Sequence, residues 1–386
     1  MFKKRKAIIK KNEMSKIIKS RKQRVKRDLK SKTYQKLNKY FHKFKIIILI
    51  SILLFIGFSH LYKKHSPTNH ELFNEKKYNS TDKISFDQQE QNTNEIKVDY
   101  SKYNNVHVGM SFNNDYYLLT TVTISSILKN AAPNTFVHIH IIEAGDFIDE
   151  TRANLSSLKY KINNNSEFIF YNGEKAMDDF GKEIKDKTYG VGEYARLLAP
   201  DLIKEDRIII FDSGDIIVKK DLVELYNIDL KDKLVWGVLD PFAPCFDDLL
   251  LHNKENYING GVLLFNSKKW REMGIYQDIL NFYKAFNFKG RLGLPIQDIL
   301  NTYLPYLSIG ILPLRYNYQY HSYISAGCVG VSEEEKRDAS ENEVIRHNNK
   351  LKPQNGQGDF STWFYYANLT GFVDELCQQF PRGCQK

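Results

Sequence analysis

An acidic turn that directly follows a buried apolar strand is the strongest chemical signal in this sequence. Residues 207–222 read RIIIFDSGDIIVKKDL, so an apolar run leads into Asp212, Ser213, Gly214 and Asp215 before apolar residues resume. Ligand sites in open α/β sheets lie beyond the carboxyl ends of strands. Two carboxylates there would supply the oxygen ligands that Mn²⁺ and Mg²⁺ prefer. The segment predicts a divalent cation that could neutralise a diphosphate. An ordinary acidic turn is the alternative, because Asp and Gly are common in turns.

Five other residues have side chains suited to phosphate, sugar or metal. Arg196 offers a planar fork of donors, and Lys352 is a point charge suited to phosphate. Asn259 precedes two glycines that would let the backbone approach a ligand, and Gln297 could place its amide against a sugar. His347 could supply an imidazole as a third metal ligand. The plainer alternatives are a surface position for Arg196, Lys352 and His347, a tight turn or bulge at Asn259, and a helix cap at Gln297.

The segments around these residues alternate between strand and helix. This alternation predicts an α/β fold whose mostly parallel sheet is flanked by helices. No Gly-x-Gly-x-x-Gly or Walker loop is present in the sequence, so ordinary dinucleotide and P-loop sites lack their main support. We expect strands at 105–111, 136–142, 166–171, 207–211, 216–218, 234–239 and 262–266, and helices at 116–128, 151–158, 270–283 and 297–303.

Six short motifs, in this order, resemble those of glycosyltransferase family 8, which includes glycogenin-like and bacterial lipooligosaccharide galactosyltransferases. The resemblance covers roughly residues 105–355. The motifs are Asn113-Asn114-Asp115-Tyr116, Tyr194-Ala195-Arg196-Leu197 followed by Pro200, the acidic turn, Asn259-Gly260-Gly261-Val262, Gln297-Asp298-Ile299-Leu300-Asn301, and His347 with Lys352-Pro353.

This resemblance implies a GT-A fold and a retaining enzyme that moves a hexose or pentose from a UDP-sugar. The acceptor would be a glycan, glycoprotein or glycolipid. The resemblance also assigns roles to individual residues. Asp212, Asp215 and His347 would hold Mn²⁺ or Mg²⁺; Asn113, Asp115, Tyr116, Asp212, Gly261 and Lys352 would bind the donor nucleotide; and Arg196, Asn259 and Gln297 would serve catalysis.

The sequence departs from the family pattern at several positions. The acidic turn is Asp-x-x-Asp where the family has Asp-x-Asp, so either Asp212 or Ser213 could fill the first position. Ile296 stands where an Asp is common, Asn113 replaces an Asp, and Gln354 replaces a Trp. These departures keep a second hypothesis open, a catalytically inactive lectin-like or scaffold protein on the same fold.

The N-terminal part of the chain predicts a membrane anchor. Residues 1–45 hold 19 Lys or Arg against two acidic residues, and residues 46–62 are apolar and lack Asp, Glu, Lys and Arg. We expect a cytosolic tail at 1–45, a signal anchor at 46–62, a flexible stem at 63–104 and a luminal catalytic domain at 105–386, in a type II protein of the Golgi or endoplasmic reticulum. A buried core helix is the alternative for 46–62. Because the basic excess is confined to the tail, nucleic-acid binding is not expected.

Sequons and cysteines all follow the apolar run, as a luminal domain requires. The sequons begin at Asn79, Asn154, Asn164 and Asn368. Four cysteines permit two disulfides in three connectivities, and four free thiols are the alternative. Cys377 and Cys384 are close enough in sequence for a small terminal disulfide, while the pairing of Cys245 and Cys328 and a homodimer are left open.

Overall fold

The computed structural model describes residues 98–145, 147–180, 191–242, 256–286, 294–304, 308–320, 322 and 331–384. The predicted tail, the apolar segment 46–62 and the stem up to residue 97 lie outside these ranges, as do Asn79, Cys245 and Cys328. Within the described ranges, no helix has the length and apolar character needed to cross a bilayer.

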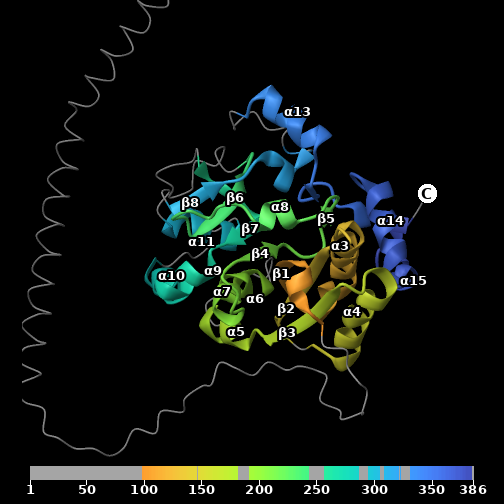
Figure 1. The fold of residues 1–386 in the computed structure, drawn as a ribbon, viewed down its shortest axis with the longest axis horizontal. Coiled ribbons are helices and arrows are strands. Elements are labelled where there is room, and N and C mark those ends of the chain that lie inside the picture. Colours follow the sequence, from red (N-terminus) through yellow and green to blue (C-terminus); the bar gives the residue numbers. More distant parts are fainter. Residues whose placement is uncertain are drawn as a thin grey trace, which may run out of the picture. The chain divides into compact units, whose positions relative to one another are not determined.

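A seven-stranded mixed sheet forms the centre of the domain (Figure 1). Four parallel strands, in the order β3-β2-β1-β4, make up one half. β7 runs antiparallel to β4 and β6, and β8 pairs parallel to β6. The predicted α/β fold with a mostly parallel sheet is therefore confirmed. The strands are β1 (Asn104–Phe112), β2 (Thr135–Glu143), β3 (Ser166–Asn172), β4 (Ile208–Phe211), β6 (Val235–Leu239), β7 (Ile258–Phe265) and β8 (Ile309–Ile311).

Apolar cores on both faces of the sheet explain why its central strands are almost continuously hydrophobic. β4 shows the alternation directly, because Ile209 and Phe211 belong to one core while Ile208 and Ile210 belong to the other. The first core is covered by four helices, α3 (Tyr117–Asn130), α4 (Asp149–Ile162), α14 (Phe360–Thr370) and α15 (Val373–Gln379) (Figure 1). The second core is covered by α5 (Glu174–Phe180), α6 (Val191–Ala195), α7 (Ala199–Leu202), α9 (Ser267–Glu272), α10 (Ile275–Phe286) and α11 (Pro295–Tyr303).

Local sequence signals set several helix boundaries. α11 begins with Pro295, which suits the first helical position because proline lacks the N–H that would be unpaired there. The Asn266 side chain caps α9 by accepting from the Lys269 N–H at 3.1 Å. The single helix predicted at 270–283 is wrong: α9 ends at Glu272 and α10 begins at Ile275, because Gly274 adopts a φ of +63° that ends the first helix.

A second, two-stranded sheet joins segments that are far apart in the sequence. β5 (Ile216–Val218) pairs antiparallel with β9 (Ile345–His347), with Ile216 opposite His347. α8 (Val223–Tyr226) follows β5, and α13 (Glu333–Glu341) precedes β9. The pairing extends beyond the strand, because the Asn348 N–H donates to the Asp215 carbonyl at 2.8 Å. This small sheet therefore brings the end of the acidic turn next to His347.

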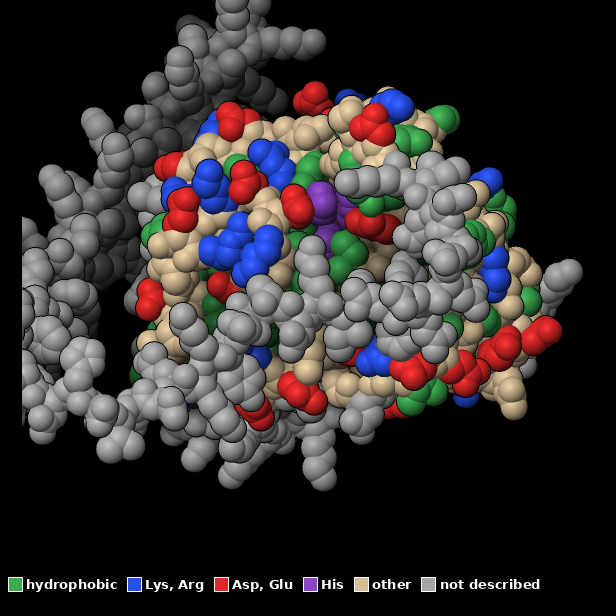
Figure 2. Space-filling view, turned by 60° about the horizontal axis from the view of Figure 1, so that its bottom comes forward, with side chains coloured by type: hydrophobic (Ala, Val, Ile, Leu, Met, Phe, Trp, Pro, Cys, Tyr) green, Lys and Arg blue, Asp and Glu red, His purple; other side chains and the backbone are tan. Residues whose placement is uncertain are grey.

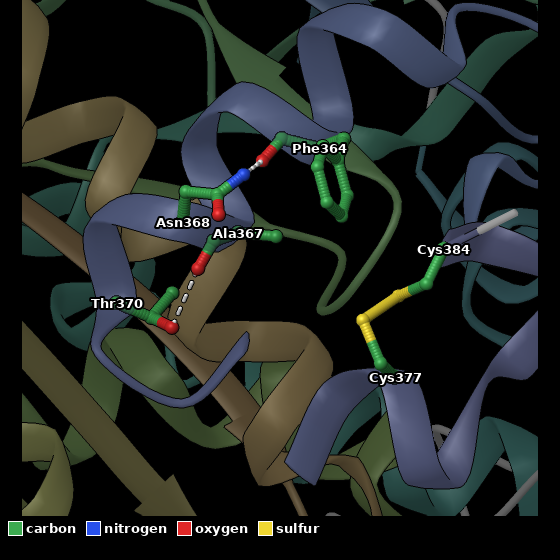
Figure 3. The surroundings of a disulfide bond; sticks show 6 residues. All are labelled: Phe364, Ala367, Asn368, Thr370, Cys377 and Cys384. Carbon is green, nitrogen blue, oxygen red and sulfur yellow. Dashed lines mark hydrogen bonds between the residues drawn. A yellow bond between two sulfur atoms is a disulfide. The ribbon is translucent and has the colours of Figure 1, made fainter. Parts of the chain in front are cut away.

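The C-terminal segment carries the predicted terminal disulfide between Cys377 and Cys384 (Figure 3). The nearby sequon lies at the end of α14, where Asn368 Nδ2 donates to the Phe364 carbonyl at 2.7 Å. Thr370 Oγ1 donates to the Ala367 carbonyl at 2.8 Å, as Figure 3 shows, and Thr370 is fully buried. Glycosylation of this sequon stays a prediction.

The domain begins before the predicted boundary at residue 105. A short 3₁₀ helix, η1 (Tyr100–Lys102), precedes β1, which starts at Asn104. The Tyr100 ring packs edge-on against Phe136, and its hydroxyl donates to Glu167 Oε2 at 2.8 Å. The last residues of the predicted stem therefore belong to the folded domain.

The described surface carries charge of both signs. On the face drawn in Figure 2, acidic side chains lie between and beside groups of Lys and Arg, and histidine side chains reach the surface next to acidic ones. This mixture fits a domain whose excess basic charge is confined to residues 1–45.

Candidate active site

The acidic turn lies at the carboxyl edge of the parallel strands. Asp212 follows β4 directly and Asn113 follows β1, and these strands are parallel neighbours, so both residues lie at the same edge. Gly214 adopts a φ of +94°, and an added Cβ would come 2.9 Å from Leu119 Cβ. The turn therefore requires glycine, and it directs the chain from the main sheet into β5.

Asp212, Asp215 and His347 converge into one cluster, as predicted. Each offers one ligand atom, and these atoms all lie within 4.8 Å of one another. His347 Nε2 lies 3.4 Å from Asp215 Oδ2. Asp215 Oδ1 and His347 Nε2 are buried and have no hydrogen-bond partner among the described residues, so both could serve as ligand atoms for a cation. The two carboxylates and the imidazole fit a divalent ion such as Mn²⁺.

Ser213 does not take the first ligand position in this geometry. Its N–H donates to Asp212 Oδ1 at 2.9 Å, and its hydroxyl donates to the Ser111 carbonyl of β1 at 3.4 Å. The Asp212 side chain is 30% exposed, and its carboxylate lies within 4.8 Å of the Asp215 and His347 ligand atoms. Asp212 is therefore the residue of the turn that joins Asp215 and His347.

Lys352 forms an ion pair with Asp215 Oδ2 at the cluster. Burial disfavours the charged form of Asp215, but the neighbouring Lys352 ammonium outweighs it and lowers the pKa of this carboxyl. Burial likewise opposes the charge of Lys352, and Asp215 outweighs it and raises the pKa of the lysine. Both groups therefore stay charged at neutral pH, and a fixed ammonium stands beside the candidate metal position.

Arg196 is buried and not a surface arginine. Its Nη1 donates to the Gly260 carbonyl at 3.0 Å and lies 3.8 Å from Asp212 Oδ1, while Nη2 pairs with Glu193. Burial opposes the charge of Arg196, but the carboxylates of Glu193 and Asp212 outweigh it, so its pKa is raised. Arg196 lies in η3 (Arg196–Leu198), directly after α6. Its guanidinium therefore links the acidic turn to β7.

Asn259 and Gln297 have their amides bonded within the protein. Asn259 lies inside β7, so the tight-turn interpretation is wrong, although the pairing of β6 with β7 changes register across this part of the strand. The Asn259 Nδ2 donates to Asp240 Oδ2 at 2.8 Å. Gln297 Nε2 donates to the same oxygen at 2.8 Å, and its Oε1 accepts from the Gly260 N–H at 2.8 Å. Their predicted contacts with a sugar stay a prediction.

Gly261 and His347 are in close contact across the site. A Cβ at Gly261 would come 2.3 Å from His347 Cε1 and 2.5 Å from Nδ1. The Gly261 carbonyl accepts from the Asp212 N–H at 2.8 Å, which ties β7 to the acidic turn. A glycine is therefore required where β7 passes the His347 ring.

The residues predicted to hold the nucleotide base lie on the outer rim. Asn113 precedes η2 (Asn114–Tyr116), its Oδ1 is buried without a hydrogen-bond partner among described residues, and its Nδ2 donates to Asp115 Oδ2 at 3.4 Å. Tyr116 is 52% exposed, and its hydroxyl lies close enough to Lys352 to affect the pKa of that lysine. The structure thus brings this segment to the edge of the cluster formed by Asp212, Asp215 and His347.

Three residues of the site were missed by sequence reasoning. Asp240 directly follows the buried strand β6, the same pattern that revealed Asp212, so it could have been found. Glu193 lies one turn before Arg196, but nothing in the sequence marks it as buried against that arginine. Asn317 accepts from His347 Nδ1 at 2.9 Å, and its position in a short loop carries no signal of its own.

Two curated relatives align with part of this chain. General stress protein A of Bacillus subtilis (strain 168) is 25% identical over 183 residues, which cover 46% of this chain and 62% of that protein. Glycosyltransferase GlyF of Streptococcus pneumoniae is 34% identical over 110 residues, 28% of this chain and 25% of GlyF. These alignments thus span less than two thirds of either relative.

Among solved structures, galactosyltransferase LgtC in complex with donor and acceptor sugar analogues superposes with a TM-score of 0.55 at 23% identity, covering 69% of this chain and 95% of LgtC. This likeness shows a shared GT-A fold. The model of the protein family "Glycosyl transferase family 8" matches residues 107–353, which is more than half of the chain. By that match, this chain belongs to glycosyl transferase family 8.

Proposed function

We propose that this protein is a metal-dependent glycosyltransferase, which moves a hexose or pentose from a UDP-sugar to a glycan, glycoprotein or glycolipid with retention of configuration. The convergence of Asp212, Asp215 and His347, with two buried ligand atoms lacking hydrogen-bond partners among the described residues, is the observation that carries this proposal. Hard cations that bind such ligands are suited to the diphosphate of a nucleotide sugar.

The residues around the cluster would divide the work as follows. Asp212, Asp215 and His347 would hold Mn²⁺ or Mg²⁺, which when bound neutralises charge on the diphosphate. Lys352 would place its ammonium against the phosphate oxygens, and Arg196 would hold Asp212 and β7 in position through the contacts described above. Asn113, Asp115 and Tyr116 would bind the uridine at the rim.

The transfer itself would exchange one C–O bond for another. The bond between the anomeric carbon and the UDP oxygen breaks, and the acceptor hydroxyl forms the new bond from the same face. The hydroxyl proton passes to the departing diphosphate oxygen. Preorganised charge at the leaving group, from Lys352 in particular, would supply the main rate effect.

The experiment that tests this proposal is a panel of UDP-sugars incubated with the full chain in detergent, with UDP release as the readout. We expect release with one donor in the presence of Mn²⁺, and a loss of at least about 100-fold with chelator or in Asp215→Asn. Activity undiminished in chelator would contradict the metal role. Absence of both UDP and Mn²⁺ binding by calorimetry would favour the lectin-like or scaffold alternative.

We also propose that residues 46–62 anchor the protein in a Golgi or endoplasmic reticulum membrane, with residues 105–386 in the lumen. The basic tail at 1–45 and the sequons beyond the apolar run support this placement. Expressed in a eukaryotic host, the protein should sediment with membranes and shift in mobility on endoglycosidase treatment. Recovery in the soluble fraction would refute the anchor. Membrane association without glycosidase sensitivity would refute the luminal placement. The relatives GlyF and General stress protein A come from bacteria, so this experiment is needed to test the eukaryotic location.

A further inference from the structure

The His347 imidazole is oriented by a buried chain of amide groups that begins at a backbone N–H. The Gly261 N–H donates to Asn259 Oδ1 at 2.8 Å, and Asn317 Nδ2 donates to the same oxygen at 2.9 Å. Asn317 Oδ1 then faces His347 Nδ1 at 2.9 Å. Asn259, Asn317 and His347 are each at most 5% exposed, so these bonds are shielded from water.

The chain of bonds fixes which nitrogen of His347 carries the proton. A backbone N–H can only donate, so the Asn259 atom that it meets must be the oxygen. Its nitrogen then faces the Asp240 carboxylate, which can only accept when ionised, at 2.8 Å. The Asn317 atom that meets the Asn259 oxygen must be the nitrogen, which leaves its oxygen for His347. His347 Nδ1 therefore carries the hydrogen, and Nε2 presents a lone pair toward Asp215.

We infer that Asn317 is a positioning residue that holds His347 in the tautomer and orientation needed to bind the metal. The inference rests on the proposed function, because it assigns His347 as a ligand. Partners of this kind on the far nitrogen of a ligand histidine typically contribute 10–100-fold to metal affinity. The same chain links the site to Gln297, since Asp240 Oδ2 accepts from both Gln297 Nε2 and Asn259 Nδ2 at 2.8 Å.

The first measurement is the affinity of the full chain for Mn²⁺ alone, with free Mn²⁺ followed by electron paramagnetic resonance. Asn317→Leu removes the acceptor at similar size, and we expect about 10–100-fold weaker binding. Asn317→Asp keeps an oxygen opposite Nδ1 but sets its other oxygen against Asn259 Oδ1, so it should recover only part of that loss. A folded Asn317→Leu protein that binds Mn²⁺ as tightly as the wild type would overturn the inference.

A matched control separates this role from general support of β7. Asn301 braces the same strand, because it accepts from the Ile258 N–H and donates to the Ile258 carbonyl, both at 2.8 Å. The bonds recorded for Asn301 do not reach His347 or Asn317. Asn301→Leu should lower the unfolding temperature yet leave Mn²⁺ affinity within about threefold of the wild type. Equal losses of Mn²⁺ affinity in both Leu variants would overturn the inference.

The second measurement needs no metal. Long-range ¹⁵N spectra of the metal-free full chain labelled at histidine, with His347 assigned by His347→Asn, report which ring nitrogen is protonated. We expect a protonated Nδ1 in the wild type and a shift toward Nε2 protonation in Asn317→Leu. A wild-type ring protonated at Nε2 would overturn the inference. Absence of Mn²⁺ binding by the wild type with the expected tautomer would instead count against the proposed function alone.

Discussion

The Gly261 backbone lies directly against the His347 ring, and an added Cβ would come 2.3 Å from Cε1. Gly261→Ala should therefore displace the imidazole and weaken Mn²⁺ binding by at least about 10-fold, a loss that calorimetry would measure. Gly274→Ala is the control, because a Cβ there meets nothing within 4 Å although φ is +63°. It should lower stability by about 1 kcal/mol and leave Mn²⁺ affinity unchanged. Equal metal affinity in Gly261→Ala and the wild type would contradict the contact.

Removal of the Arg196 guanidinium should be costly because two carboxylates depend on it. Arg196→Leu leaves Glu193 and Asp212 without their shared cation, and we expect a loss of about 3–5 kcal/mol in the free energy of unfolding, measured by urea denaturation. Adding Glu193→Gln removes one of these charges and should restore part of the stability. UDP release should stay low in the double variant, because Asp212 still lacks its partner. Full activity in that variant would limit Arg196 to a structural role.

A histidine cluster on the second-core face of the sheet should make stability depend on pH. The rings of His107 and His138 stack at 4.1 Å, and His107 Nδ1 lies 3.0 Å from His140 Nε2. Burial and the neighbouring His138 lower the pKa of His107 to about 3, even though Glu167 opposes the shift. The unfolded chain thus binds more protons between pH 6.5 and 3, so stability falls as pH falls through that range.

This shift corresponds to about 2 kcal/mol lost from His107 alone between neutral pH and pH 5. His107→Phe keeps an aromatic ring without a titrating group, so its unfolding free energy should decline less over the same range. Urea titrations at pH 7 and pH 5 provide the comparison. Parallel declines in the two proteins would exclude His107 as the source.

The terminal disulfide supports the loop that carries Lys352. A Cβ at Gly383 would come 2.7 Å from the Gln354 carbonyl, so the closed loop between Cys377 and Cys384 lies against η8 (Pro353–Asn355), directly after the lysine. Replacing both cysteines with serine should lower the free energy of unfolding by about 2 kcal/mol in urea. It should also raise KM for the UDP-sugar more than it lowers kcat. An unchanged KM would show that Lys352 is positioned without the disulfide.

The sequence revealed the parts of the fold that depend on local pattern. Every strand expected from an apolar run is present, and the acidic turn lies where the strand-then-Asp pattern of residues 208–212 placed it. Asp212, Asp215 and His347 converge as predicted. The reason is physical: strands buried on both faces must be apolar, and polar residues directly after them must reach a common edge.

Features that depend on long-range packing were not predictable in the same way. A surface position was the alternative for Arg196, and its burial beside Glu193 and its bond to the Gly260 carbonyl depend on tertiary packing that the sequence does not show. Asn317 is one of many asparagines in the chain, and only its pairing with His347 and Asn259 distinguishes it. The pairing of β5 with β9 could not be predicted either, because each strand is only three residues long and carries too little pattern to identify its partner.

The pairing of β5 with β9 also determines when the site can exist during folding. Asp215 and His347 come from opposite ends of a long stretch of chain, whose ends must meet before the two ligands face each other. Closing such a loop costs entropy that only the completed domain repays. A cation that binds both strands would stabilise only the completed fold, so its binding would add no stability to partly synthesised chains.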